Sequence, residues 1–174
     1  VPSTEADLAY YLDATGYVAV ALNDGVFDAA TSTGSNVPVS LFKIKNPNNN
    51  NTDTLTFFWN GQSNVAASTN VISLDIWNST LATWITASTN NFTAADMDFT
   101  FESVTSGSAL FDANYFIMVR VKQAAGAEAL KTDFISASFA PAPSRMIVFW
   151  DRTDIPLGWT CISCNIGDDF YQRF

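Results

Sequence analysis

Histidine is absent from the 174-residue sequence, and charged side chains are scarce. Without an imidazole the chain lacks the commonest general base, the usual activator of a nucleophile and the usual zinc ligand. Charged residues make up 14% of the chain, against about a quarter in average soluble proteins, so Ser, Thr and Asn must supply most of the polar surface. We therefore expect a protein without catalytic residues, metal or cofactor, located outside the cell or at the cell surface.

Basic residues and long apolar runs are also in short supply. The chain has eight Lys and Arg against seventeen Asp and Glu, a net charge of −9, which disfavours nucleic acid as a partner because phosphates would be repelled. No apolar run is long enough to cross a bilayer as a helix, so we predict no membrane span. The sequence begins Val1-Pro2-Ser3-Thr4 without Met, as expected of a mature end left by processing.

Only two cysteines are present, Cys161 and Cys164, and their spacing is that of a C-x-x-C motif. A thioredoxin-type redox centre would need this motif within a βαβ unit, and the surrounding sequence has no such pattern. Two cysteines without histidine also cannot complete a four-ligand zinc site. We expect a local disulfide between Cys161 and Cys164, formed in an oxidising compartment.

What the sequence does have is alternation of apolar and polar residues with a period of two. Met97, Phe99 and Phe101 alternate with polar residues, which is typical of a half-buried strand. Alternation or apolar enrichment predicts further strands at 37–45, 55–59, 72–76, 81–86, 115–121, 133–139 and 146–150. Clusters rich in Asn, Gly and Ser separate them. The fold class predicted is all-β, an immunoglobulin-like antiparallel β-sandwich, with a barrel as the alternative.

The two ends differ from the centre and suggest three parts. Residues 1–24 form an N-terminal extension, residues 25–140 the sandwich, and residues 141–174 an irregular C-terminal segment that opens on the stiff linker Ala140-Pro141-Ala142-Pro143. Within the extension, Tyr17–Leu22 is predicted to be a strand. The preceding stretch fits two interpretations, an alternating strand or a helix capped by Thr4 and Asp7. The apolar residues that would form an extension strand are Leu8, Tyr10, Leu12, Val18, Val20 and Leu22.

Three N-glycosylation sequons are present, at Asn50, Asn78 and Asn91. Each lies in or beside a predicted loop, where an attached glycan could be solvated. An Asn- and Thr-rich chain also produces such triplets by chance, and that interpretation stays open beside modification.

Acidic and aromatic residues provide further candidates. The pairs Asp168–Asp169 and Asp151–Asp154 could act as acid and base in a hydrolase, and Asn23-Asp24-Gly25 with Asp28 could supply oxygen ligands to calcium. Neither set has the spacing of a complete site, and solvated turns explain both. The five tryptophans could instead stack on sugars, although Trp in a sandwich usually belongs to the core; they include Trp59, Trp77, Trp84 and Trp159.

The C-terminal segment carries the most specific sequence feature. Ile155-Pro156-Leu157-Gly158-Trp159-Thr160-Cys161, followed by Phe170-Tyr171-Gln172-Arg173-Phe174, resembles the start of the phage tail-collar module. The cysteine follows the tryptophan one residue earlier than in that family, and the module would continue further. The resemblance covers residues 146–174 and implies a fibre-like, oligomeric surface protein.

The organisation of the whole chain resembles that of bacterial pilus and fibril subunits that assemble by donor-strand exchange. It shares with them an apolar N-terminal extension, a sandwich body and an acidic Thr- and Asn-rich surface. This resemblance implies a filament of copies of the chain, in which the extension strand pairs with an exposed sheet edge of its neighbour. The alternative function is a carbohydrate-binding or receptor-binding domain of a virus or phage fibre, with glycans as partners.

Overall fold

The computed structural model describes residues 12–31, 37–124 and 129–141. The chain divides into two compact units, residues 1–142 and 143–174, and all described residues belong to the first. The predicted strand at 146–150 and the segment that resembles the tail-collar module lie outside the described residues.

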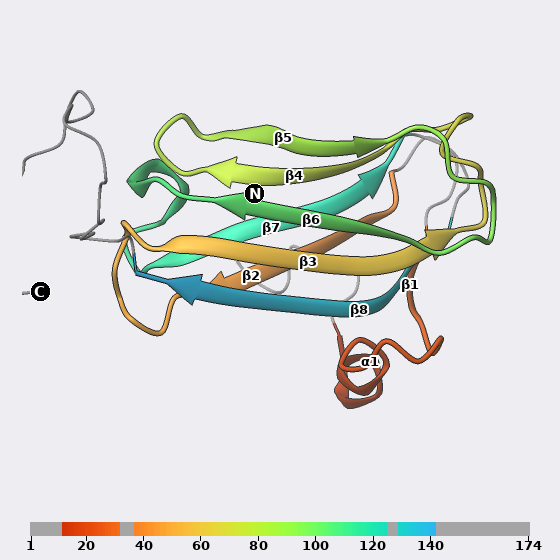
Figure 1. Cartoon of the computed structure of the whole chain (residues 1–174), viewed down its shortest axis with the longest axis horizontal. Coiled ribbons are helices and arrows are strands. Elements are labelled where there is room, and N and C mark those ends of the chain that lie inside the picture. The colour runs from red at the N-terminus through yellow and green to blue at the C-terminus, as the bar shows by residue number, and fades with distance from the viewer. Residues whose placement is uncertain (1–11, 32–36, 125–128, 142–174) are drawn as a thin grey trace, which may run out of the picture. The chain divides into compact units, whose positions relative to one another are not determined.

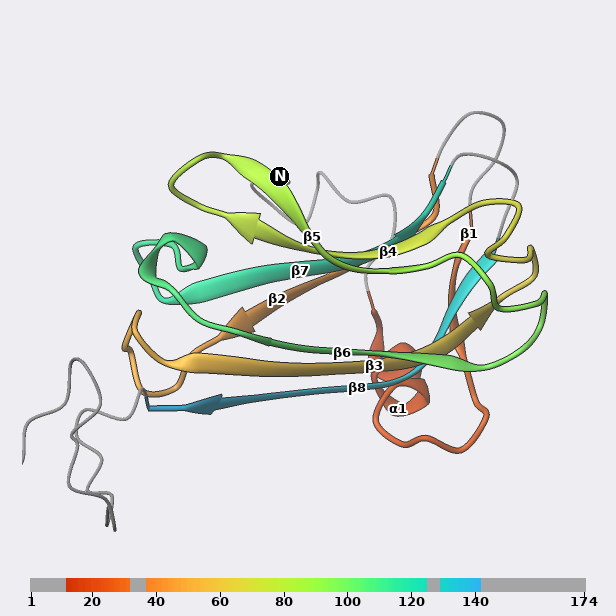
Figure 2. The same cartoon turned by 45° about the horizontal axis from the view of Figure 1, so that its top comes forward.

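The first unit contains eight strands in two four-stranded antiparallel sheets (Figures 1 and 2). The order is β1-β8-β3-β6 in one sheet and β2-β7-β4-β5 in the other. Along the chain the elements are α1 (Ala14–Ala19), β1 (Asp28–Thr31), β2 (Val39–Lys45), β3 (Thr54–Ser63), β4 (Ile72–Asn78), β5 (Thr83–Asn90), β6 (Phe99–Thr105), the 3₁₀ turn η2 (Ser108–Leu110), β7 (Phe116–Gln123) and β8 (Ala129–Ala140). The all-β sandwich expected from the sequence is confirmed.

The pairing scheme makes this sandwich a jelly roll. β4 pairs with β5, β3 with β6, β2 with β7 and β1 with β8, so the chain runs as one long hairpin that is rolled into two layers. An immunoglobulin domain has a different strand order, so the antiparallel sandwich expected from the sequence is present here with jelly-roll connections. Alternation shows that a segment is a strand with one buried face, but it does not name the strand's partner.

The core lies between the layers and is filled by the inward side chains of both sheets. β7 shows the pattern clearly, because its alternate residues Ile117, Val119 and Val121 are at most 1% exposed while the residues between them are partly exposed. In the facing sheet Leu55, Phe57 and Trp59 of β3 are equally buried. In Figure 2 the layer with β3, β6 and β8 lies below the layer with β4, β5 and β7.

The N-terminal part of the described chain is helical where a strand was expected. Asp13 caps α1 by accepting a hydrogen bond from the backbone N–H of Gly16 at 2.9 Å. Gly16 and Ala19 are buried, while Tyr17 and Val18 point to solvent. A short apolar run does not distinguish strand from helix by itself, and here the Asp cap and the packing of the helix decide. The chain then joins the sandwich, since the Ile135 N–H donates to the Val20 carbonyl at 3.2 Å.

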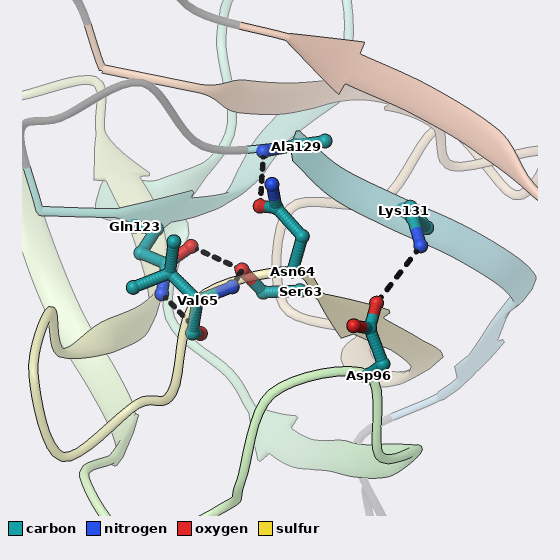
Figure 3. Close-up of polar contacts among 7 residues, drawn as sticks. All are labelled: Ser63, Asn64, Val65, Asp96, Gln123, Ala129 and Lys131. Carbon is teal, nitrogen blue, oxygen red and sulfur yellow. Dashed lines mark hydrogen bonds and ion pairs between the residues drawn. The ribbon is translucent and has the colours of Figure 1, made fainter.

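A buried glutamine connects the two sheets at one end of the sandwich (Figure 3). Gln123, at the end of β7, is 0% exposed. Its side-chain oxygen accepts a hydrogen bond from the Ser63 hydroxyl of β3 at 2.5 Å, and its amide donates to the carbonyls of Val65 and Asn70 at 3.0 Å each. The side-chain amide of Gln123 thus bonds to groups within the protein, and we assign it a structural role in joining the two sheets.

Candidate functional site

The outward side of the β2-β7-β4-β5 sheet carries an unusual set of side chains. We call it the outer face and define it by the outward residues of its four strands, which are Val39, Leu41, Lys43, Lys45, Phe116, Met118, Arg120, Lys122, Ser73, Asp75, Trp77, Trp84, Thr86 and Thr89. The register places Arg120 of β7 opposite both Leu41 of β2 and Asp75 of β4. Arg120 therefore stands at the centre of the outer face.

Two tryptophans form a cross-strand pair on the outer face. Trp77 of β4 is directly opposite Trp84 of β5, their ring centroids are 5.3 Å apart, and the ring planes meet at 64°. Both side chains are partly exposed. The turn at Asn78 brings them together, because the Asn78 side-chain oxygen accepts hydrogen bonds from the N–H groups of Thr80 and Leu81. Aromatic pairs prefer this edge-to-face geometry over a face-to-face stack, and part of each side chain stays accessible to solvent.

Beside the tryptophans a buried carboxylate organises the cations. Asp75 is 1% exposed, and its carboxylate accepts hydrogen bonds from Arg120 Nε at 2.8 Å and from the Thr86 hydroxyl at 2.9 Å. The Lys122 ammonium lies 3.6 Å from the same carboxylate. Burial by itself would raise the pKa of Asp75, but these hydrogen bonds and the two positive charges outweigh it, and the pKa lies below its ordinary value. Asp75 is thus ionised at neutral pH and holds Arg120 in place.

The other half of the outer face combines an aromatic ring with two lysines. Lys43 Nζ lies 4.6 Å from the centroid of the Phe116 ring, and Lys45 Nζ lies 5.3 Å from it. Lys45 also donates a hydrogen bond to the carbonyl of Asn114. Both lysines are exposed. The ring quadrupole attracts the ammonium groups, so this end of the outer face also presents positive charge next to an apolar surface.

The tryptophans are therefore divided between two environments. Trp59 is fully buried, and its indole N–H donates to Thr132 at 3.0 Å, as expected of a core tryptophan. Trp77 and Trp84 lie on the outer face, against the expectation that most tryptophans belong to the core. Their positions seven residues apart, symmetric about the turn at residues 79–82, are a signal that could have identified them as a cross-strand pair. Trp150 and Trp159 lie outside the described residues.

The structure separates the three sequons. Asn91 is exposed, whereas Asn78 is 7% exposed and its side chain forms the turn described above. The Asn50 side-chain amide donates to the Asp53 carboxylate at 2.7 Å, and its oxygen accepts from Thr52. The asparagine side chains of this loop, Asn48 foremost, hold the pKa of Asp53 below its ordinary value. Only at Asn91, among the described sequons, does the acceptor amide have open surroundings.

The remaining candidates are the calcium loop, which the structure describes, and residues that lie outside the described part of the chain. Asp24 and Gly25, from the candidate calcium loop, donate backbone hydrogen bonds to the side chain of the buried Asp133 at 3.1–3.3 Å, so this loop covers Asp133. Within residues 12–31, 37–124 and 129–141 there is no cluster of three side chains suited to a metal. The cysteines Cys161 and Cys164 and the aspartate pairs 151/154 and 168/169 lie outside the described residues, as do Leu8 and Tyr10.

The described donor-strand candidates do not form a strand. Leu12 is partly buried ahead of α1, Val18 is on the exposed side of α1, Val20 is 4% exposed at its C-terminal end, and Leu22 is 63% exposed. The extension strand expected for Val18, Val20 and Leu22 was wrong. Assembly into a filament stays a prediction without a described donor strand.

The chain is similar to a solved structure described as "CBM4 structure and function", with 14% sequence identity, a TM-score of 0.46, and coverage of 72% of this chain and 98% of that chain. No curated protein matches the sequence. In the part of the chain that the structure describes, no helix is long and apolar enough to cross a membrane. The sequence model of the AF_1625_C domain family, described as "Uncharacterized protein, C-terminal domain", matches residues 1–140, and the chain belongs to this family.

Proposed function

We propose that the outer face binds carbohydrate and that the protein acts as a glycan-binding module. The observation that carries this proposal is the partly exposed Trp77–Trp84 pair beside the Asp75–Arg120 ion pair. Sugar rings present an apolar C–H side and a rim of hydroxyl groups. A site for them needs flat aromatic surface together with fixed hydrogen-bonding groups, and the outer face offers both.

Preorganisation supports this use of the outer face. Trp84 contacts two side chains, Trp77 and Arg120. The guanidinium carbon of Arg120 lies 4.2 Å from a Trp84 ring centroid. Arg120 is fixed in turn by Asp75. Side chains already held in one arrangement lose little conformational entropy when a ligand binds, which improves affinity. Because the strands of the sandwich position this surface, binding of a glycan would require no change in backbone conformation.

The shape of the outer face favours an extended ligand. Adjacent strands are about 4.8 Å apart, so the path from Lys43 on β2 to Trp84 on β5 crosses three strand spacings, about 14 Å. This span is longer than one sugar ring. An oligosaccharide or polysaccharide chain lying across the strands could contact both aromatic ends of the outer face.

The test is calorimetric titration of the protein with a panel of soluble polysaccharides, comparing wild type with Trp84→Ala and Trp77→Ala. We expect each substitution to weaken binding at least about fivefold, because truncating a contact tryptophan costs about 1 kcal/mol or more. Phe92→Ala is the matched control, since Phe92 is 78% exposed in the loop after β5. Failure of the folded protein to bind any polysaccharide, or equal binding by W84A, would contradict the proposal.

A further inference from the structure

Positive charge is concentrated on one sheet of a strongly acidic protein. The strands of the β2-β7-β4-β5 sheet carry four cations, Lys43, Lys45, Arg120 and Lys122, and one carboxylate, Asp75. The strands of the other sheet carry the opposite balance, with Lys131 as the single cation beside Asp28, Glu102 and Asp133. Half of the eight basic residues in the whole sequence thus belong to the sheet that has the Trp77–Trp84 pair.

Neutralising Asp75 does not use up these cations. One carboxylate balances one positive charge, so the strands of this sheet keep three. Lys43 and Lys45 are exposed and lie over the Phe116 ring, away from the strand that carries Asp75. A cation over an aromatic ring stays available to an anion in solvent, because the ring offers it no counter-charge.

The carboxylates on the strands of the opposite sheet do not cancel this local charge at physiological ionic strength. The two layers of a sandwich are about 10 Å apart, and the Debye length at 0.15 M is about 8 Å. The carboxylates on the far sheet are therefore at least one screening length from a ligand on the outer face. A ligand there experiences mainly the charges of this sheet and its adjoining loops, even though the net charge is −9. Asp112 is among them, because its carboxylate accepts a hydrogen bond from the Phe116 N–H at 2.9 Å.

We propose that the outer face selects anionic glycans, meaning chains that carry carboxylate or sulfate groups, over neutral ones. This inference rests on the proposed glycan-binding function and specifies its ligand class. Lys43 and Lys45 would pair with the acidic groups at one end of the ligand while a sugar ring packs on Trp84 at the other. Arg120 lies between the two ends, opposite Leu41 and beside Asp75.

The experiment measures binding to matched pairs of polysaccharides that share a backbone and differ in charge. Suitable pairs are polygalacturonate with its methyl ester, carboxymethylcellulose with hydroxyethylcellulose, and chondroitin sulfate with desulfated, carboxyl-esterified chondroitin. We expect the anionic member of at least one pair to bind at least about fivefold more tightly at 0.15 M salt. Raising the salt concentration should weaken binding of the anionic member and leave the neutral one nearly unchanged.

Two Lys-to-Gln variants identify which cations select the anionic glycan. K43Q/K45Q should weaken binding of the anionic glycan about fivefold, since each surface charge contact contributes roughly 0.5 kcal/mol, and should leave its neutral counterpart unaffected. K131Q removes the described cation of the opposite sheet and should change neither. Thermal melting of each variant establishes that the fold is retained.

The possible failures are distinguishable. Equal or tighter binding of the neutral members, with dependence on Trp84, would overturn anionic selection while the glycan-binding function stands. Loss of all polysaccharide binding would overturn both. A single-stranded oligonucleotide serves as a polyanion control, and binding of it as tightly as the best anionic glycan would overturn selection for glycans.

Discussion

The guanidinium of Arg120 lies over the ring of Trp84, 4.2 Å from a ring centroid, while its Nε donates to the buried carboxylate of Asp75. One side chain on β7 thereby couples the aromatic surface of β5 to the ion pair on β4. The outer face behaves as a connected unit for this reason, and changes at Arg120 reach both its charge and its aromatic surface.

Arg120→Lys tests this coupling. Lysine keeps the charge but lacks the planar group that stacks on an indole while donating to a carboxylate. We expect glycan affinity to fall several-fold and the free energy of unfolding to fall by about 1 kcal/mol, which is the range for a partly exposed pair. Calorimetric titration and urea denaturation measure the two effects. A variant that matches wild type in both would show that the stacking contributes nothing.

Acid should destabilise the protein partly through Asp75. Its pKa is lowered in the folded state relative to the ordinary value of 3.8, so its contribution to stability is present above 3.8 and is lost as the pH falls through the folded-state pKa. Thermal melts at successive pH values below 4 should therefore show a smaller decline for Asp75→Asn than for wild type. The variant should also be less stable at pH 7, by about 1–2 kcal/mol. An equal decline in both proteins would contradict this assignment.

Gln123→Ala, in the polar cluster of Figure 3, should lower the free energy of unfolding more than a glutamine-to-alanine change outside the cluster. The substitution leaves the Ser63 hydroxyl and two carbonyls without the partner that the amide supplies. Buried groups without a partner cost about 1–3 kcal/mol each, and partial access of water should limit the loss to about 2–4 kcal/mol. Urea denaturation measures it. Gln62→Ala on β3, whose side chain is on the opposite side of the strand, should cost less than about 1 kcal/mol.

Glycosylation should follow exposure among the sequons. In a host that N-glycosylates secreted proteins, we expect a glycan at Asn91, and Asn91→Gln should remove the corresponding mass shift. Asn78→Gln and Asn50→Gln should leave the mass shift unchanged, because Asn78 is buried and the Asn50 amide donates to Asp53. Intact-mass spectrometry before and after enzymatic deglycosylation decides. A glycan that persists in N91Q would contradict the prediction.

Local pattern was sufficient for some elements and misleading for others. β4 and β7 were predicted because their inward residues alternate over five or more positions, a signal that needs no tertiary context. The alternation of Met97, Phe99 and Phe101 located the start of β6, although Met97 itself precedes the strand and is exposed. β1 was missed because it is only four residues long and three of them, Asp28, Ala29 and Ala30, are of types depleted in strands. At 17–20 the same kind of apolar run that predicts a strand belongs to α1 and its C-terminal end, since the Asp13 cap and the fit of Gly16 and Ala19 against the sandwich outweigh the weak preference of so short a segment.

The sequence by itself determined the all-β class, most of the strands and the residue types available for function, because alternation and composition are local properties. Only the tertiary structure decided which strands pair, that Trp59 is core while Trp77 and Trp84 are surface, and that four cations separated by up to 79 positions in the sequence share one sheet. The physical reason is that alternation assigns the side chains of each strand to two faces but does not specify which strands pair with it. Pairing and register across the rolled hairpin supply that information, and with them the outer face.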